Sequence, residues 1–262
     1  MPDYLMEAAD EAARLELKTQ VDETRAHLTL VGLRPGMRAL DAGAGTGAVA
    51  REMAAMVGEA GSVVAFDQSQ ERLDEGRKLS PAKNLEFVKG DLYAPPLEPG
   101  SFDFIWCRFI FEYLSDPDAA LAQFKRLLKP GGKVVVGDLD GNTIWHYPEP
   151  PEVAEGLPKI MRAIEGQFDP HAGRKLFHRF RRAGLEQLRV HLLPYHLFAG
   201  EASARDMSNW EAKIRNLRGP GEKTLGREGW ERFGRAYLEM LRAPDSLTYS
   251  VLFFVEGVRP RE

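Results

Sequence analysis

The sequence predicts an α/β protein built on a doubly wound, mostly parallel sheet. Three observations lead to this fold class. Short apolar runs alternate with helix-forming stretches between about residues 37 and 138, as expected for strands buried between two layers of helices. Turn-forming glycine and proline residues separate the runs. Polar or charged side chains follow the ends of several runs, which is where ligands bind in such sheets.

Length and composition describe one ordinary globular domain. The 262 residues are 44% hydrophobic and carry a formal net charge of −4. These values suit a single core and argue against a generally nucleic-acid-binding surface. The single cysteine, Cys107, excludes an intramolecular disulfide and a multi-thiolate metal site. The first residues lack the basic and apolar regions of a signal peptide, and no run reaches the roughly 18 apolar residues that span a bilayer. We therefore expect a cytoplasmic protein with no membrane span.

The first 32 residues are helical by pattern. Apolar residues recur at spacings of three and four from Leu5 to Val31, and the phase slips between Leu15 and Leu17. This slip indicates two helices or a bend. The segment Gly32-Leu33-Arg34-Pro35-Gly36 then ends the helix and turns into the first strand.

Strands and helices alternate from residue 37 onward. Because the carboxyl ends of parallel strands lie at one edge of a sheet, the polar side chains at those ends should share one site. These side chains are Asp41, Asp67, Asp91, Arg108 and Asp138. The expected strands are the run into Asp41 and residues 62–66, 85–90, 102–107 and 133–138, and the expected helices are 48–57, 70–79 and 116–128.

Beyond Asp138 the alternation breaks within what we expect to be one domain, residues 1–262. Three segments, 1–32, 139–168 and 203–243, lie outside the alternation, and we predict that they gather into a helical lid on the 33–262 core. The expected elements are a loop at 139–151, helices at 152–165 and 171–183, a strand at 188–193, two helices within 203–243 joined by Arg218-Gly219-Pro220-Gly221, and a last strand at 247–256.

The strongest motif is Asp41-Ala42-Gly43-Ala44-Gly45-Thr46-Gly47, between an expected strand and an expected helix. Glycine allows a turn to adopt positive φ and allows the backbone to lie against a ligand. The second strand ends in Asp67, whose carboxylate can accept two hydrogen bonds from a ribose diol. The third ends in Asp91-Leu92, where a carboxylate could accept a hydrogen bond from an adenine amino group. The fourth runs into Cys107-Arg108.

In their order and spacing, the glycine motif and the three strand ends resemble those of the class I S-adenosylmethionine-dependent methyltransferases, of the ubiquinone/menaquinone-biosynthesis-like small-molecule branch. The resemblance covers about residues 30–140. It implies a Rossmann-like methyltransferase fold of seven strands with the last two antiparallel, S-adenosylmethionine as cofactor and S-adenosylhomocysteine as product. It also implies these cofactor contacts: Asp41, Gly43 and Gly45 at the methionine end, Asp67 and Gln68 at the ribose, Asp91 and Leu92 at the adenine, the backbone of Cys107 and Arg108 at the ammonium, and Tyr4 and Gln20 from the N-terminal segment.

Other ligands and chemistries fit the motifs less well. The dinucleotide turn of NAD-binding proteins prefers Gly-x-Gly-x-x-Gly, and here the third glycine comes one place early. No Gly-Lys-Ser/Thr follows, which excludes a P-loop. Instead of binding a ligand, Asp67 could cap the following helix, but Ser69 fits that role better. Asp91 could likewise form a turn without contacting a ligand. Base N-methylating enzymes would show Asn/Asp-Pro-Pro-Tyr/Phe at 106–109. Cys107 lies inside an apolar run, so we expect no nucleophilic thiolate there.

The loop expected after residue 138 offers candidates for a metal and for a base. Asp138, Asp140 and Asn142 carry oxygen ligands for a hard cation, but neither an EF-hand nor an adjacent Asp-Asn pair is present, so we expect no metal. His146 is the candidate catalytic base, because it could take a proton from an acceptor; a loop histidine without a role fits equally well. Three aromatic residues suit a partly apolar acceptor pocket: Trp145, Tyr147 and Trp210.

A basic run at 174–182 is expected to form a solvated helix face, with Leu176, Phe177 and Phe180 facing the sheet. A patch for RNA phosphates or an acidic substrate is the alternative. We therefore predict methyl transfer by in-line displacement to the O, N or C atom of a small-molecule acceptor, in a monomer or homodimer without a nucleic-acid partner. An RNA or protein methyltransferase and a non-catalytic S-adenosylmethionine-binding module remain the alternatives.

Overall fold

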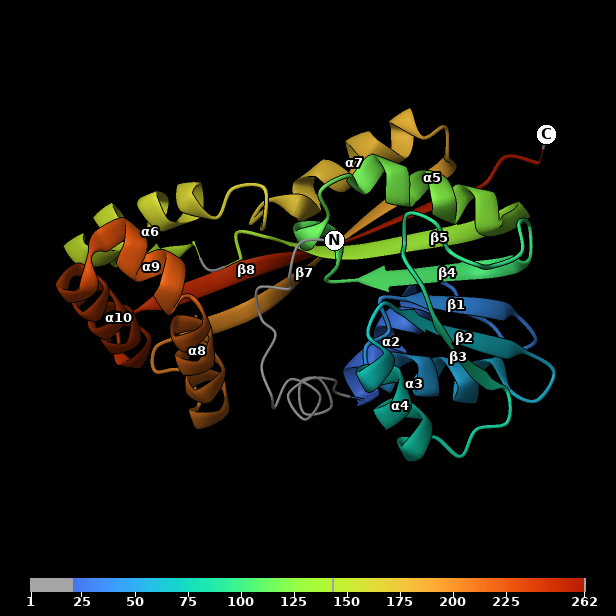
Figure 1. Cartoon of the computed structure of the whole chain (residues 1–262), viewed down its shortest axis with the longest axis horizontal. Coiled ribbons are helices and arrows are strands. Elements are labelled where there is room, and N and C mark those ends of the chain that lie inside the picture. Colours follow the sequence, from blue (N-terminus) through green and yellow to red (C-terminus); the bar gives the residue numbers. More distant parts are fainter. Residues whose placement is uncertain (1–20, 143, 262) are drawn as a thin grey trace.

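The computed structural model describes residues 21–142 and 144–261, which form an α/β structure around one sheet (Figure 1). The described strands follow the order β3-β2-β1-β4-β5-β8-β6, and β7 also pairs with β8. The first five strands are parallel, and β8 runs antiparallel to β5, β6 and β7. The predicted fold class is confirmed. The strands are β1 (Arg38–Ala42), β2 (Ser62–Asp67), β3 (Leu85–Lys89), β4 (Phe102–Arg108), β5 (Leu128–Asp140), β6 (His146–Tyr147), β7 (Glu186–Ala199) and β8 (Leu247–Val258).

Helices cover both faces of this sheet. α2 and α3 lie on one face with α4, whereas α5 and α7 pack on the other, and each layer closes one apolar cluster. The helices are α2 (Val21–Leu30), α3 (Ala48–Val57), α4 (Gln70–Leu79), α5 (Pro117–Leu127), α6 (Pro151–Ala163), α7 (Ala172–Arg182), α8 (Ala204–Asn216), α9 (Arg218–Leu225) and α10 (Arg227–Arg242), with a 3-10 helix η1 at Phe111–Tyr113. None of the described helices has the length and apolarity needed to cross a bilayer.

The periodicity of the helices explains which residues they bury. On α3, Ala50, Met53, Ala54 and Val57 are buried, at the spacing that forms one helix face. On α7, Leu176 and Phe180 are likewise fully buried against the sheet, four residues apart. The prediction that Phe177 also faces the sheet is wrong, because one helical position turns a side chain by about 100°, and Phe177 is 48% exposed.

The described part of the sheet has eight strands, so the predicted number of seven is wrong. The additional strand β6 lies in the segment that was expected to be a loop, and it pairs with the first two residues of β8. β8 is long enough to pair with β5 over residues 251–258 and then to continue along β6. A strand of two residues is too short to show a period in the sequence.

The end of β7 and β8 that extends beyond the parallel strands carries a separate group of helices (Figure 1). Helices α6, α8, α9 and α10 share one apolar cluster, which we call the helical cluster: Val153, Leu157, Ile160, Phe198, Ala202, Met207, Trp210, Trp230, Phe233, Tyr237, Met240 and Leu241. Two of the three predicted lid segments therefore meet here, whereas α2, from the first segment, packs against α3. Their role as a lid stays a prediction.

Residues 203–243 form three helices, where two were predicted. The expected linker Arg218-Gly219-Pro220-Gly221 is the first turn of α9. Proline is tolerated in a first helical turn because the N–H groups there have no partner within the helix. Glycine and proline therefore marked the beginning of a helix in this segment, not a connection between two helices.

Candidate functional site

The glycine turn after β1 has the backbone geometry that its sequence predicts. Gly43, Gly45 and Gly47 all have positive φ, at 82°, 56° and 75°. The N–H groups of Gly43 and Ala44 donate to the carbonyl of Phe66 at 2.8 and 3.0 Å, which ties the turn to β2. A Cβ on Gly43 would lie 2.5 Å from the side chain of Ile110. The turn therefore needs glycine both for its conformation and for its packing.

Asp67, at the end of β2, is bound directly to this turn. Its Oδ2 accepts a hydrogen bond from Gly45 N at 2.8 Å, and its Oδ1 accepts one from Ser69 N at 2.9 Å. Ser69 caps α4 by accepting a hydrogen bond from Arg72 N, which confirms that Ser69 and not Asp67 is the helix cap. The neighbouring Gln68 is exposed. Asp67 therefore fixes the glycine turn while its carboxylate retains lone pairs for a ligand.

Asp41, near the end of β1, is the least satisfied carboxylate of the site. It is 3% exposed, and within the described ranges its Oδ2 has no hydrogen-bond partner. Burial raises the pKa of Asp41 to about 7; the guanidinium of Arg108 opposes this rise, and the carboxylate of Asp67 adds to it. A buried polar atom without a partner costs free energy. This environment therefore suits a ligand that brings a cationic donor to Asp41.

The end of β4 contributes Cys107 and Arg108. Cys107 is fully buried, and burial, followed by the charges of Asp138 and Asp41, raises the pKa of its thiol well above the usual value. A thiol in this environment stays protonated, which agrees with the expectation that it is not a nucleophile. Arg108 lies with its guanidinium 5.0 Å from the centre of the Phe109 ring, and its positive charge acts to lower the pKa of Asp41.

Asp91 and Leu92 follow β3 at the same edge of the sheet. Gly90 N donates to the carbonyl of Asp67 at 3.0 Å, which holds this segment beside the end of β2. Asp91 is exposed and its Oδ1 accepts from Tyr93 N at 2.9 Å, so it does form a turn. Leu92 is buried in the apolar cluster on the α5 face. Of the other predicted contacts, Tyr4 and Gln20 lie outside the described residues.

A second polar group lies at the ends of β4 and β5, and sequence reasoning missed its central residue, Glu112. Glu112 is 4% exposed, and its backbone N–H donates to Asp138 Oδ2 at 3.0 Å. Its Oε2 accepts from Asn142 Nδ2 at 3.1 Å. We call Glu112, Asp138 and Asn142 the acidic cluster. The signal available in the sequence was an acid inside the apolar run Phe109-Ile110-Phe111-Glu112-Tyr113, directly after a strand.

The other acids after β5 are held by α7. Arg174 donates two hydrogen bonds to Asp140, at 2.6 and 2.8 Å, and His171 Nδ1 lies 3.1 Å from the same carboxylate. Lys175 and Arg179 pair with Asp169 and Asp118. Several charges of the basic run thus serve to bind α7 to its surroundings. Among the described residues, no group of three or more His, Cys, Asp or Glu could hold a metal ion.

His146, the candidate base, lies in β6 with both ring nitrogens engaged. Nδ1 is 2.9 Å from Thr248 Oγ1, and Nε2 is 3.2 Å from the hydroxyl of Tyr237. Asp138 is paired with Phe253, five residues along β8 from Thr248, which corresponds to about 17 Å of strand. This arrangement argues against His146 as the base and favours a structural role between β8 and the helical cluster.

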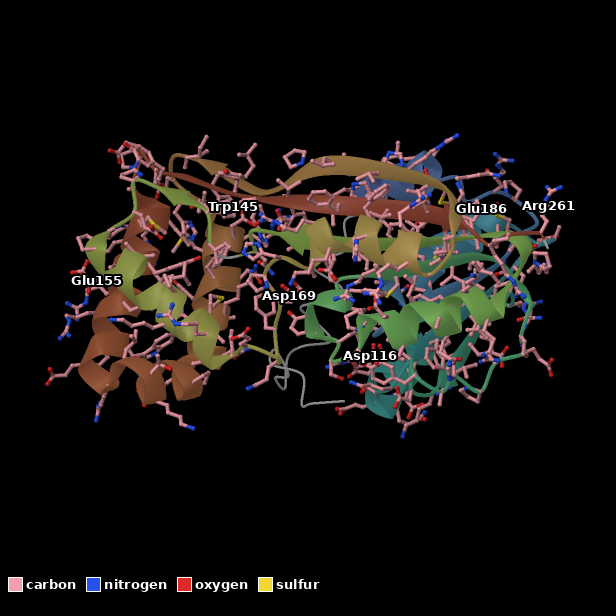
Figure 2. The ribbon with its side chains drawn as sticks, turned by 90° about the horizontal axis from the view of Figure 1, so that it is seen from above. Asp116, Trp145, Glu155, Asp169, Glu186 and Arg261 are labelled. Carbon is pink, nitrogen blue, oxygen red and sulfur yellow. The ribbon has the colours of Figure 1, made fainter. Side chains whose placement is uncertain are left out.

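The three aromatic residues predicted to line an acceptor pocket do not meet. Trp145 packs against Tyr249 at 5.1 Å between ring centroids, whereas Trp210 is buried in the helical cluster against Tyr237. Tyr147 is 76% exposed. Thr248 and Tyr249 are neighbours in β8, so their side chains face opposite sides of the sheet. Trp145 lies on the Tyr249 side, whereas Trp210 packs against Tyr237, which contacts His146 on the Thr248 side. Figure 2 shows Trp145 and Asp169 toward the middle of the long axis of the molecule.

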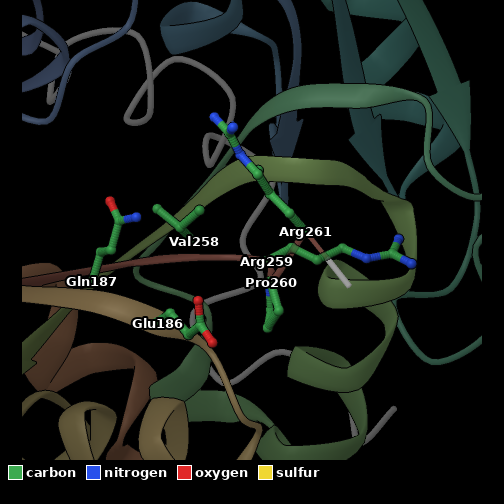
Figure 3. Close-up of a pocket in the computed structure, with 7 residues that line it drawn as sticks. Glu186, Gln187, Val258, Arg259, Pro260 and Arg261 are labelled. Atoms are coloured by element: carbon green, nitrogen blue, oxygen red, sulfur yellow. The ribbon is translucent and has the colours of Figure 1, made fainter.

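A pocket also lies at the opposite edge of the sheet (Figure 3). Its lining comes from the start of β5 and β7 and from the end of β8: Gly131, Glu186, Gln187, Val258, Arg259, Pro260 and Arg261. Gly131 and Asp138 lie near opposite ends of β5. This pocket is therefore separate from the strand tips that carry Asp41, Asp67 and the acidic cluster.

Comparison with known proteins shows which family the part of the chain that carries the glycine turn is similar to. The model of the methyltransferase domain matches residues 40–136, which contain the glycine turn and the ends of β2, β3 and β4. The matched residues make up less than half of the 262-residue chain. This match confirms the resemblance to class I S-adenosylmethionine-dependent methyltransferases that the motifs predicted.

Relatives of the methyltransferase domain include a ubiquinone/menaquinone biosynthesis C-methyltransferase of Shewanella sp. (strain ANA-3). It is 39% identical over 109 residues, which are 40% of this chain and 43% of the relative. An uncharacterized 37.1 kDa protein in transposon TN4556 of Streptomyces fradiae is 34% identical over 148 residues, or 53% of this chain and 42% of that protein. The chain thus spans less than half the length of these curated relatives.

A solved structure shares the fold over nearly the whole chain. The crystal structure of an S-adenosylmethionine-dependent methyltransferase from Aquifex aeolicus superimposes with a TM-score of 0.58, covering 97% of this chain and 99% of the other at 20% identity. The sheet, its two helical layers and the helices beyond residue 139 therefore form an architecture that is shared with a solved methyltransferase.

Proposed function

We propose that this protein transfers a methyl group from S-adenosylmethionine to a small-molecule acceptor. The observation that carries the proposal is the buried Oδ2 of Asp41, which lacks a partner within the described ranges, beside a glycine turn that donates to Asp67. The methyltransferase domain match over the same residues supports it. Because the chain spans only part of its curated relatives, the activity of the whole protein stays a proposal.

The residues at the strand tips fit this cofactor in kind and in order. Asp41 would receive the ammonium of the methionine moiety beside the turn of Gly43 and Gly45, with the backbone of Cys107 and Arg108 nearby. Asp67 would accept from the ribose hydroxyls with Gln68 next to it, and Asp91 and Leu92 would contact the adenine. When bound, the cofactor supplies a methyl carbon on a positively charged sulfur, which leaves as a neutral thioether. The protein has to place the acceptor in line and exclude water.

Two features support a small-molecule acceptor over a nucleic acid. The net charge is −4, and three basic side chains of α7, those of Arg174, Lys175 and Arg179, pair with acids of the same chain. An RNA-binding enzyme needs free cations along its surface, and its binding falls steeply with salt. We expect the methylation rate to change little between 50 and 300 mM salt. A cytoplasmic location and a monomeric or homodimeric state stay predictions.

The cofactor proposal is tested by calorimetry with S-adenosylhomocysteine on the Asp67→Asn variant. The amide keeps one acceptor for Gly45 N–H but loses the charge, so we expect an affinity at least about tenfold weaker. Asp245→Asn changes an exposed acid and serves as the control, with unchanged affinity. Undiminished binding by Asp67→Asn would place the nucleoside elsewhere. Release of S-adenosylhomocysteine with an acceptor separates the enzyme from a non-catalytic binding module.

A further inference from the structure

Arg108 carries a positive charge at the strand tips that the proposed cofactor contacts do not use. Those contacts involve only its backbone, whereas its guanidinium is half-buried beside the ring of Phe109. An arginine side chain stays charged and offers five N–H donors. Among the described residues, this guanidinium has no hydrogen bond and no ion pair. Its donors are therefore available to a ligand.

Other half-buried arginines of the described ranges use their donors within the chain. Arg126 and Arg259 each donate to two backbone carbonyls. Arg179 pairs with Asp118. A half-buried guanidinium without such partners loses part of its hydration and gains no hydrogen bonds in exchange. A ligand that supplies acceptors to Arg108 would remove this cost.

The side chain of Arg108 leans away from the glycine turn. Arg108 is paired with Gly137 of β5, and its Cγ would lie 3.4 Å from a Cβ on Gly137, so the side chain crosses this glycine. The neighbouring ring of Phe109 packs against Tyr195 of β7, at 5.4 Å between ring centroids. In the sheet, β5 and β8 lie on the side of β4 opposite β1 and β2, and β7 pairs with β8. The guanidinium therefore lies away from the proposed ribose and adenine contacts, on the side that is left for an acceptor.

The backbone of Phe109 supports this arrangement. Its φ is 60°, in the left-handed region that a bulky residue rarely adopts, and its N–H donates to the carbonyl of Gly137 at 2.8 Å. Residues in such strained conformations cluster at ligand sites. The centre of the Phe109 ring is 5.0 Å from the guanidinium of Arg108, close enough for the ring to attract the cation. The guanidinium is thereby positioned before a ligand binds.

Asp41 does not supply the missing partner of Arg108. The two side chains lie on one face of the sheet, because Asp41 is paired with Trp106 and Arg108 is two residues further along β4. The charge of Arg108 acts to lower the pKa of Asp41, but burial raises this pKa to about 7. Under the proposed function, the ammonium of the cofactor pairs with Asp41, and its sulfonium adds another positive charge. Arg108 is then left to an anion, which is either a group of the acceptor or the carboxylate of the methionine moiety.

We propose that Arg108 binds an oxyanion of the acceptor, a carboxylate or a phosphate, so that the compound to be methylated is an organic acid. The inference rests on the proposed methyl transfer and names the substrate class of that site. A guanidinium matches these groups in charge and can form two parallel hydrogen bonds to them. The bound acid group would also hold the nucleophilic atom in one orientation toward the methyl carbon. A neutral acceptor would leave the donors of Arg108 unpaired.

The test compares acids with neutral compounds of similar shape. Wild-type protein saturated with S-adenosylhomocysteine is titrated by calorimetry at pH 8 with phenylacetate and phenyl phosphate, and in parallel with phenylacetamide and phenethyl alcohol. We expect an acid to bind at least about tenfold more tightly than the neutral compounds. Equal binding of acids and neutral compounds, or no acid binding by protein that binds S-adenosylhomocysteine, overturns the proposal.

Variants assign the effect to Arg108. Arg108→Gln removes the charge and keeps the backbone, so the preference for acids should fall to within about twofold. Arg108→Met provides a second variant if Arg108→Gln does not fold, and Arg108→Lys should restore part of the preference because it restores the charge. Arg181→Gln changes an exposed arginine in the last turn of α7 and is the matched control. An unchanged preference for acids in Arg108→Gln or Arg108→Met overturns the assignment.

An analogue without the carboxylate separates the two sources of an anion. If Arg108 binds the acceptor, Arg108→Gln should bind S-adenosylhomocysteine and S-adenosyl-3-thiopropylamine, which lacks the carboxylate, each within about threefold of wild type. A loss of tenfold or more that is confined to S-adenosylhomocysteine would assign Arg108 to the methionine carboxylate and overturn the proposal. Failure of the wild type to bind S-adenosylhomocysteine would instead refute the proposed function.

Discussion

The buried carboxylate of Asp41 predicts an unusual dependence of stability on pH. Burial raises the pKa of Asp41 from 3.8 to about 7 in the folded protein. The folded state therefore binds a proton more tightly than the unfolded state does, and stability falls as pH rises from about 4 to about 7. Above pH 7 the full penalty is present, about 4 kcal/mol at 1.36 kcal/mol per pKa unit. Asp41→Asn removes the titrating group and hence this slope.

Urea denaturation of the wild type and of Asp41→Asn at pH 5 and pH 8 measures the effect. Linkage with these pKa values gives a penalty of roughly 2 kcal/mol at pH 5 and about 4 kcal/mol at pH 8. The free energy of unfolding of the variant, relative to wild type, should thus rise by roughly 2 to 3 kcal/mol between the two pH values. Taking the difference cancels other titrating groups, and Asp245→Asn, an exposed acid, should show no such rise.

A pH-independent difference between Asp41→Asn and wild type would refute the reasoning, because it would mean that the carboxylate is solvated or already paired. Cofactor binding provides a second test of the ionisation of Asp41. If Asp41 receives an ammonium, binding of S-adenosylhomocysteine near pH 6 should lower its pKa and release a proton. Calorimetry in buffers of different ionisation enthalpy counts that proton, and Asp41→Asn should release none and bind at least about tenfold more weakly.

Two further predictions concern residues outside the proposed contacts. Glu256→Gln should lower the free energy of unfolding by about 2 kcal/mol at pH 7. Burial acts to raise the pKa of Glu256, but hydrogen bonds from Lys133 and His191 lower it overall, so the stabilisation is present above about pH 4.5 and is lost as the pH falls further. If urea denaturation shows an equal loss of stability for the variant at pH 3, the prediction is contradicted. His146→Phe should lose the hydrogen bonds to Thr248 and Tyr237 and therefore about 1–2 kcal/mol of stability. We expect the kcat of this variant to stay within about twofold of wild type. A large fall in kcat in a folded variant would instead support His146 as the base.

Local chemistry made the edge of the sheet that is proposed to bind the cofactor predictable. Helices α3 and α4 lie at the predicted residues, 48–57 and 70–79, because caps, glycine turns and apolar periods act within a few residues. Ser69 caps α4 as expected. The positive φ values of Gly43 and Gly45 follow from the same local rule. Periodicity failed where tertiary pairing decides the structure, as in β6, whose two residues are strand only because β8 passes beside them.

By itself, the sequence determined the class of sheet, the glycine turn and the acids that follow its strands, since each depends on residues close together in the chain. Only the tertiary structure decided which buried groups meet. Asp138 contacts Glu112 across 26 residues, Asn142 reaches Glu112 across 30, Arg174 reaches Asp140 across 34, and His146 reaches Thr248 across 102. No local period encodes such contacts, because they arise when distant segments pack together and exclude water. The contacts of His146 with Thr248 and Tyr237 arise in this way, and its role as the base stays a prediction.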